Sequence, residues 1–259
     1  MSFESYPATI ERAVLDNYWR SIQEKGRHVL AIAVAMIAAE LSRGGFGDER
    51  QIEQVVLSET LNSPKPEDVK KGTKEVILEA LKEGDQVYIW TVGDEGAYND
   101  EEKQVTYPAY NFQQRKIKGS RFLESLSEQA QSESGSAESI PDNLHLSINA
   151  ENKISALVSI ISKARQDGIR HLYVVDDQQR NIDMAEDLQG QFPDVGIHTW
   201  RVDDSSDKGT FSKFVEEKWS NRNKGEKVVL VLDWDDTVYD EMGRMRRLIH
   251  NLQSKLAKK

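Results

Sequence analysis

The chain has 259 residues, with 44 Asp and Glu against 34 Lys and Arg, so its formal net charge is −10. This acidic balance argues against nucleic acid as a partner, because nucleic-acid binding needs a basic surface. The chain contains no Cys, which excludes disulfides, thiolate nucleophiles and cysteine metal sites. Catalytic chemistry therefore has to come from carboxylates, hydroxyls, Lys or the five His residues.

The first part of the chain is helical in pattern. Apolar residues recur every three or four positions over 8–62, and the segment from Gly44 to Asp48 interrupts them. The most apolar stretch, Val29 to Ala39, is too short to cross a bilayer, so we expect a buried helix and no membrane span. The first residues lack the basic and apolar regions of a signal peptide, and we expect a cytoplasmic protein.

From residue 67 onward, helices and short apolar strands alternate. Continuous apolar strands separated by helices predict an α/β fold with a parallel sheet covered on both faces. One expected helix covers Lys153 to Gln166. The expected strands lie within 86–93, 171–177, 196–202 and 227–237.

This pattern predicts two domains. We expect an α/β core over 67–239 and a helical cap made of 1–66 together with 240–259, whose final helix is basic and amphipathic. Within the core, residues 124–143 are rich in Ser, Glu and Gln. We expect a flexible loop there, because the segment buries too little apolar area to offset the entropy of ordering it.

Acidic residues directly follow two of the expected strands. Asp176 and Asp177 end one strand, and Asp233, Asp235 and Asp236 follow the other. Ligands of open α/β sheets bind at the carboxyl ends of strands, where clustered carboxylates would repel one another without a cation. Oxygen ligands without His or Cys favour Mg²⁺ over zinc. Alternatively, these acids cap the helices that follow.

These residues carry a resemblance to the haloacid dehalogenase (HAD) superfamily. The segment from Asp233 to Thr237, after an apolar strand, resembles the first motif of that family, and Thr91 at a strand end resembles the second. Lys153 resembles the third motif, and Val174 to Asn181 resembles the fourth. In the family the first motif precedes the others, whereas here it follows them. The chain therefore resembles a circularly permuted member, which implies a HAD-like Rossmannoid sheet with helices on both faces and a helical cap.

The resemblance implies an enzyme, a phosphoric monoester hydrolase. Asp233 would be the nucleophile that becomes a phospho-aspartate, and Asp235 would act as general acid and then as general base. Thr91 would donate a hydrogen bond to the phosphoryl group, and Lys153 would neutralise its charge and hold the nucleophile.

The same resemblance implies Mg²⁺ as the cofactor. A carboxylate that attacks a phosphate monoester needs a cation to overcome the charge repulsion. The metal would bind the carboxylates of Asp233 and Asp177 and the backbone carbonyl of Asp235, with Asp176 as an outer or alternate ligand.

The substrate implied is a small phosphorylated metabolite, because a cap restricts access to the site. A phosphoprotein or a nucleic-acid end is an alternative substrate, the latter because of the basic final helix. A non-catalytic phosphate- or metal-sensing module is a further alternative, because receiver domains also gather acids, Thr and Lys around Mg²⁺. Asp235 discriminates between these classes, because a phosphatase needs it and a sensor does not.

Overall fold

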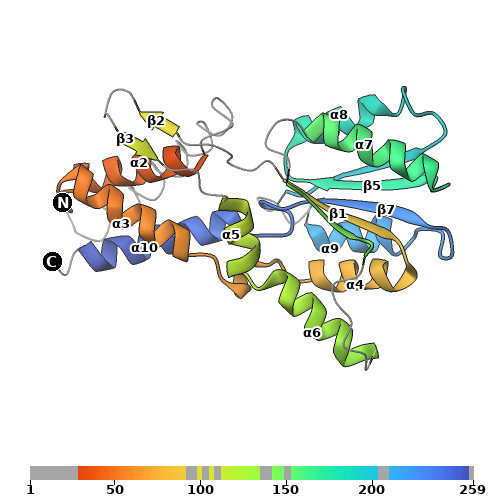
Figure 1. Cartoon of the computed structure of the whole chain (residues 1–259), viewed down its shortest axis with the longest axis horizontal. Coiled ribbons are helices and arrows are strands. Elements are labelled where there is room, and N and C mark those ends of the chain that lie inside the picture. The colour runs from red at the N-terminus through yellow and green to blue at the C-terminus, as the bar shows by residue number, and fades with distance from the viewer. Residues whose placement is uncertain are drawn as a thin grey trace. The chain divides into compact units, whose positions relative to one another are not determined.

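A computed structural model of the protein describes residues 29–91, 98–100, 105–107, 112–134, 142–148, 153–203 and 210–256. The chain divides into two units (Figure 1). Unit 1 takes the described residues of 1–68, 93–120 and 241–259, and unit 2 those of 69–92 and 121–240. The expected core of 67–239 differs from unit 2 chiefly in 93–120, which belongs to unit 1. The helix expected over 8–28 lies outside the described residues.

Unit 2 is built on a five-stranded sheet in which every strand pairing is parallel. The strand order is β4-β1-β7-β5-β6, so β7 is central. This confirms the α/β class and the parallel sheet. The strands are β1 (Gln86–Thr91), β4 (Leu144–Ile148), β5 (His171–Asp176), β6 (Gly196–Arg201) and β7 (Val228–Asp233).

Helices cover both faces of this sheet (Figure 1). One face carries α7 (Lys153–Gln166) and α8 (Gln179–Leu188). The other carries α4 (Thr73–Glu83) and α9 (Phe211–Phe214), which continues as a π-helical turn, η2 (Val215–Trp219). A sheet buried on both faces explains why the central strand, β7, is buried at all six positions.

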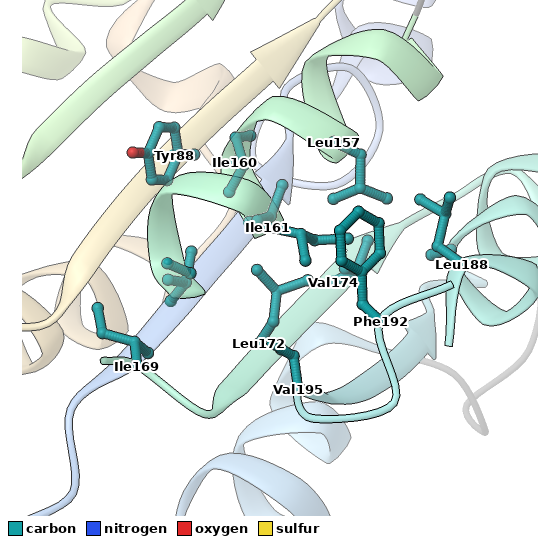
Figure 2. Close-up of a cluster of buried hydrophobic side chains, with 14 of the residues drawn as sticks. Tyr88, Leu157, Ile160, Ile161, Ile169, Leu172, Val174, Leu188, Phe192 and Val195 are labelled. Carbon is teal, nitrogen blue, oxygen red and sulfur yellow. The ribbon is translucent and has the colours of Figure 1, made fainter. Parts of the chain in front are cut away.

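The core beneath α7 and α8 is a continuous apolar cluster (Figure 2). Leu157, Ile160 and Ile161 of α7 pack against Leu172 and Val174 of β5. Residues two apart on a strand share one face, so Asp176 follows Leu172 and Val174 on the side of the sheet that α7 covers. By the same alternation Asp233 follows Val229 and Val231, which belong to this cluster.

Unit 1 is mainly helical and holds a small antiparallel hairpin, β2 (Tyr98–Asp100) with β3 (Val105–Tyr107). Its apolar core combines α2, α3 and α10, with Ile37, Val56 and Leu248 among its fully or almost fully buried members. In the described part of the chain, no helix is both long enough and apolar enough to cross a membrane. The helices are α2 (Val29–Arg43), α3 (Glu49–Asn62), η1 (Pro66–Asp68, a 3-10 turn), α5 (Phe112–Gly119) and α10 (Glu241–Leu256).

A buried ionic cluster lies at the start of α10. The Arg244 guanidinium lies 2.8 and 2.5 Å from the two carboxylate oxygens of Glu241, and Lys116 Nζ of α5 lies 3.3 Å from Glu241. Arg244 also donates to Ser63 Oγ at 2.5 Å. These contacts join α5 to α10 and explain why 93–120 groups with unit 1.

The flexible loop expected over 124–143 is wrong for its first half, because α6 spans Phe122–Ser134. Phe122 and Leu126, four residues apart on one helix face, are both buried. The Phe122 ring meets the Trp234 ring edge-on, with 5.1 Å between centroids. The burial of these two apolar side chains stabilises a helix whose Ser, Glu and Gln content had suggested a loop. Residues 135–141 lie outside the described part of the chain.

Candidate functional site

Three carboxylates meet at the carboxyl edge of the sheet. Val175 of β5 pairs with Leu232 of β7, so the next residue of each strand, Asp176 and Asp233, lies at the same level. Asp177 follows β5 directly. One carboxylate oxygen from each of the three Asp residues lies within 4.8 Å of the others. The acidic residues expected at these two strand ends lie close together. We call Asp176, Asp177 and Asp233 the acidic cluster.

Lys153 joins two of these acids. As the first residue of α7, it places its ammonium 2.8 Å from Asp176 Oδ2 and 2.5 Å from Asp233 Oδ1. Burial disfavours the charged form of Lys153, but the charges of Asp176 and Asp233 outweigh that effect and raise its pKa. Lys153 is therefore a fixed cation between the ends of β5 and β7.

The indole of Trp90 is a contact that the sequence did not reveal. Lys153 Nζ lies over this ring, 4.9 Å from its centroid, a cation–π distance. Trp90 is 1% exposed, and its backbone pairs with Asp233. An aromatic residue directly before a strand-end Thr was the available signal, but nothing in the sequence shows that it meets the lysine.

Asp176 organises the cluster through its backbone and amide partners. Its Oδ1 accepts hydrogen bonds from the Gln178 backbone N–H and the Asn181 amide, both at 2.9 Å. Its Oδ2 faces Lys153. Both oxygens of Asp176 are thus engaged within the protein. Asn181 belongs to the segment that resembles the fourth motif of the family. The structure shows that its side-chain amide binds Asp176.

Asp177 differs from Asp176, because its Oδ1 is buried and has no hydrogen-bond partner among the described residues. Burial, followed by the charge of Asp176, raises the pKa of Asp177 to about 7. Burial also raises the pKa of Asp233, although Lys153 opposes the shift. One lysine does not balance this many acids, and the charge deficit favours a bound cation. An all-oxygen donor set with a free carboxylate oxygen fits Mg²⁺.

Asp235 acts on the cluster through its charge, which raises the pKa of both Asp177 and Asp233. It lies in the tight loop 234–239 that follows β7. Asp236 in this loop has a left-handed backbone with φ of 55°, a conformation that Asp tolerates better than most residues. Lys70 donates a hydrogen bond to this loop, with its Nζ 2.5 Å from the Asp236 carbonyl oxygen.

Thr91 is the remaining expected site residue. It ends β1, the strand beside β7, one position beyond the pairing of Trp90 with Asp233. It is 3% exposed and shares the carboxyl edge with the acidic cluster. Thr91 takes part in none of the hydrogen bonds or ion pairs described above. Lys70 is the second residue that sequence reasoning missed, because its role rests on a long-range contact to a backbone carbonyl.

Comparison of the chain with protein-family models, with curated proteins and with solved structures gives no match.

Proposed function

We propose that the protein is a Mg²⁺-dependent phosphomonoester hydrolase of the HAD type, with a circularly permuted core. One observation carries the proposal: Lys153 is paired with Asp176 and Asp233 within a group of three strand-end carboxylates. If these acids only capped helices or formed structural ion pairs, one or two of them would be enough. A metal-assisted site with a carboxylate nucleophile would instead use several acids, a cation and a fixed lysine together.

The sheet topology supports the permuted core. Counted from β7 as the first strand, then β1, β4, β5 and β6, the sheet order reads 3-2-1-4-5, the doubly wound order. The order reverses between β7 and β5, the topological switch point where such sheets bind ligands. Asp233 and Asp176 end these two strands. The motif from Asp233 to Thr237 comes last in this sequence. It thus follows β7, the strand that would come first in an unpermuted chain.

The donor set supports Mg²⁺ at this position. We propose that Asp177, Asp233 and the Asp235 backbone carbonyl hold the metal, with Asp176 as an outer residue that orients its neighbours. When bound, the metal would offset the repulsion between the carboxylates and a phosphate group.

The proposed chemistry uses Asp233 as the nucleophile. A carboxylate oxygen of Asp233 attacks phosphorus, the bond to the leaving oxygen breaks, and Asp235 gives that oxygen its proton. Water then attacks the phospho-aspartate, Asp235 takes the proton from the water, and inorganic phosphate leaves. Lys153 favours the ionised form of Asp233 and orients it, and Thr91 donates a hydrogen bond to the phosphoryl oxygens.

The proposed substrate is a small phosphorylated metabolite, and the proposed cap that would select it is 1–66 together with 240–259. Phosphoproteins and nucleic-acid ends are the alternative substrates, which a panel of phosphomonoesters would separate. A protein that binds Mg²⁺ and hydrolyses none of them would instead be a phosphate- or metal-sensing module.

The proposal is tested by hydrolysis of an aryl phosphate with and without Mg²⁺. We expect metal-dependent turnover by the wild type and a loss of at least about 1,000-fold for Asp233→Asn. The matched control is Asp187→Asn, which changes an exposed acid of α8 outside the cluster. Activity that persists in Asp233→Asn, or that needs no divalent cation, would overturn the assignment.

A further inference from the structure

An arginine lies at the carboxyl end of the sheet, beside the acidic cluster. Arg201 ends β6, the strand next to β5, and its backbone pairs with Asp176. Asp176 in turn lies level with Asp233 on β7. Neighbouring strands lie about 4.8 Å apart, so the Cα atoms of Arg201 and Asp233 are separated by roughly 10 Å.

The side chain of Arg201 lies on the face of the sheet that α7 and α8 cover, which is also the face of the strand-end carboxylates of β5 and β7. Two positions earlier on β6, Thr199 donates a hydrogen bond to Glu186 of α8 at 2.7 Å. Residues two apart on a strand share one face, so Arg201 also faces α8. Its Nη1 lies 3.5 Å from Oε1 of Gln179, the first residue of that helix. A cation and the proposed nucleophile therefore lie on one face, at one edge of the sheet.

The guanidinium of Arg201 is held by neutral groups. Its Nε donates a hydrogen bond to the Asp177 backbone carbonyl at 3.2 Å, and its Nη1 faces the Gln179 amide oxygen. Among the described residues it has no acidic partner, whereas the exposed Arg170 pairs with Asp194. A guanidinium carries five N–H donors, so several of those of Arg201 remain for a ligand. The side chain is exposed, and a ligand can reach it.

We propose that Arg201 is a specificity-determining residue that binds a second anionic group, a carboxylate or a second phosphate, on the substrate. This inference rests on the proposed function and narrows the substrate class to phosphomonoesters that carry such a group. Guanidinium matches carboxylate and phosphate oxygens with paired, charge-assisted hydrogen bonds. The hydrogen bond to the Asp177 carbonyl already orients the guanidinium, so less side-chain freedom is lost when the ligand binds.

Charge repulsion makes a preference for such ligands informative. The formal charges of Lys153 and a bound Mg²⁺ balance those of the three carboxylates of the acidic cluster. The phosphate of the substrate then adds negative charge, and a second anion nearby would be repelled unless another cation faced it. Tighter binding of ligands with a second anion is therefore expected only if a cation such as Arg201 receives it.

The test uses phosphonates, because their C–P bond is not hydrolysed and binding is measured apart from turnover. Phosphonocarboxylates with two, three and four methylene groups are compared with alkylphosphonates of the same chain length, and diphosphonates provide the second arm. Each ligand is titrated calorimetrically into the full chain at a fixed concentration of free Mg²⁺. We expect the wild type to bind at least one doubly anionic ligand about tenfold or more tightly than its alkyl counterpart. The arm that binds more tightly identifies carboxylate or phosphate as the second group.

Replacing Arg201 should change this preference and little else. Arg201→Met should abolish the preference and leave the affinity for alkylphosphonates unchanged within about twofold, a separation that a merely structural role would not produce. Arg201→Lys should keep part of the preference, because it keeps the charge but loses the paired donors. The matched control is Arg170→Met, which removes an exposed arginine that directly precedes β5 at the amino end of the sheet. It should bind every ligand as the wild type does.

Equal binding of the singly and doubly anionic ligands by the wild type, or a preference that survives in Arg201→Met, would overturn the proposal. If Arg201→Met does not fold, Arg201→Gln provides the same comparison. Aryl phosphate turnover, measured on the same protein, tests the proposed function separately. Charge-dependent phosphonate binding without turnover would support the role of Arg201 and overturn only the hydrolase, and turnover without such binding would do the reverse.

Discussion

The ammonium of Lys153 lies 2.5 Å from the Asp233 carboxylate, although 80 residues of sequence separate the two. The same ammonium lies 2.8 Å from Asp176, so one cation faces two buried anions. The charge balance at the end of β7 therefore depends on a single side chain from the first turn of α7.

Replacing this lysine should affect both activity and stability. Lys153→Met leaves two buried carboxylates without their cation. Removing one partner of a buried ion pair lowers the free energy of unfolding by about 3–5 kcal/mol. Phosphatase activity should fall by about 100-fold or more, because a fixed charge at the phosphoryl group is lost. Urea unfolding and aryl phosphate turnover measure the two effects.

Lys163→Met is the control for this change, because Lys163 lies on the same helix and pairs with Asp167 at the surface. It should change the unfolding free energy by less than about 1 kcal/mol and leave turnover intact. Equal effects of the two substitutions would show that the acidic cluster does not depend on Lys153.

Mg²⁺ binding should weaken as the pH falls through 7. Burial and the neighbouring Asp176 raise the pKa of Asp177 to about 7, so below this pH a proton must leave before the metal binds. One displaced proton lowers the apparent affinity about tenfold per pH unit. Calorimetry from pH 5.5 to 8.5 measures this slope. Asp177→Asn should bind Mg²⁺ more weakly and with a flatter slope, and a flat wild-type profile would contradict the assignment.

In the absence of divalent cations, stability should fall as the pH rises from about 4 to 7. The folded pKa of Asp177 is raised above its usual value of 3.8, so the folded state binds more protons than the unfolded state in this window. Stability then decreases with increasing pH until Asp177 is ionised in both states. Thermal unfolding in a chelator measures the trend, and added Mg²⁺ should reverse it. Asp177→Asn should lack this contribution, and an identical pH dependence in the variant would rule it out.

Acid should weaken unit 1 through Glu241. Burial alone would raise the pKa of this carboxyl, but Arg244 and Lys116 lower it to about 2 from its usual value of 4.5. The stabilisation is complete above pH 4.5 and is lost as the pH falls toward 2. Hydrogen exchange of the α10 amides should report the loss.

Glu241→Gln should remove this pH dependence and destabilise α10 at neutral pH, because two buried cations lose their anion. Glu59→Gln is the control, since Glu59 pairs with Lys255 at the surface of the same unit. Unchanged exchange in Glu241→Gln would mean that the ionic cluster does not hold α10.

Gly119→Ala should destabilise unit 1 although Ala is the better helix former. A Cβ at Gly119 would lie 2.9 Å from Pro64 Cβ and 3.2 Å from the Pro64 carbonyl oxygen. Overpacking of this kind costs about 1–3 kcal/mol. Gly190→Ala, whose Cβ would meet only the Asp187 carbonyl oxygen at 3.8 Å, is the control. Denaturant unfolding compares the two, and a stabilised Gly119→Ala would contradict the close contact.

The sequence predicted the central strands and the acids that follow them, because strands buried on both faces are continuously apolar. Val228–Leu232 is such a run, and Asp233 follows it directly. The edge strand β4 lacks this signal: its sequence, LHLSI, carries His145 and Ser147, and the strand was not expected. Local pattern also misjudged 124–134, since the helix there depends on the contact of Phe122 with Trp234, a residue far away in the sequence.

Parts of the candidate site were beyond any local pattern. That Lys153 meets Asp233 followed only from family resemblance, and its position over the Trp90 ring depends on how α7 crosses the sheet. The hold of Lys70 on the Asp236 carbonyl depends on a backbone turn that the residue types do not specify. The acidic residues of the site could be predicted from the ends of the strands. The contacts to backbone groups and ring faces could be found only once the fold was known.

The central place of β7 has a consequence for the assembly of the sheet during synthesis. The pairs β1–β4 and β5–β6 are complete in the chain before β7 is made, yet the edges of β1 and β5 that face each other have no partner until it arrives. Until then, these two exposed edges are open to pairing with other chains. Because β7 pairs with both edges and its last residue, Asp233, contacts Lys153, the sheet and the candidate site both depend on the last strand to be made.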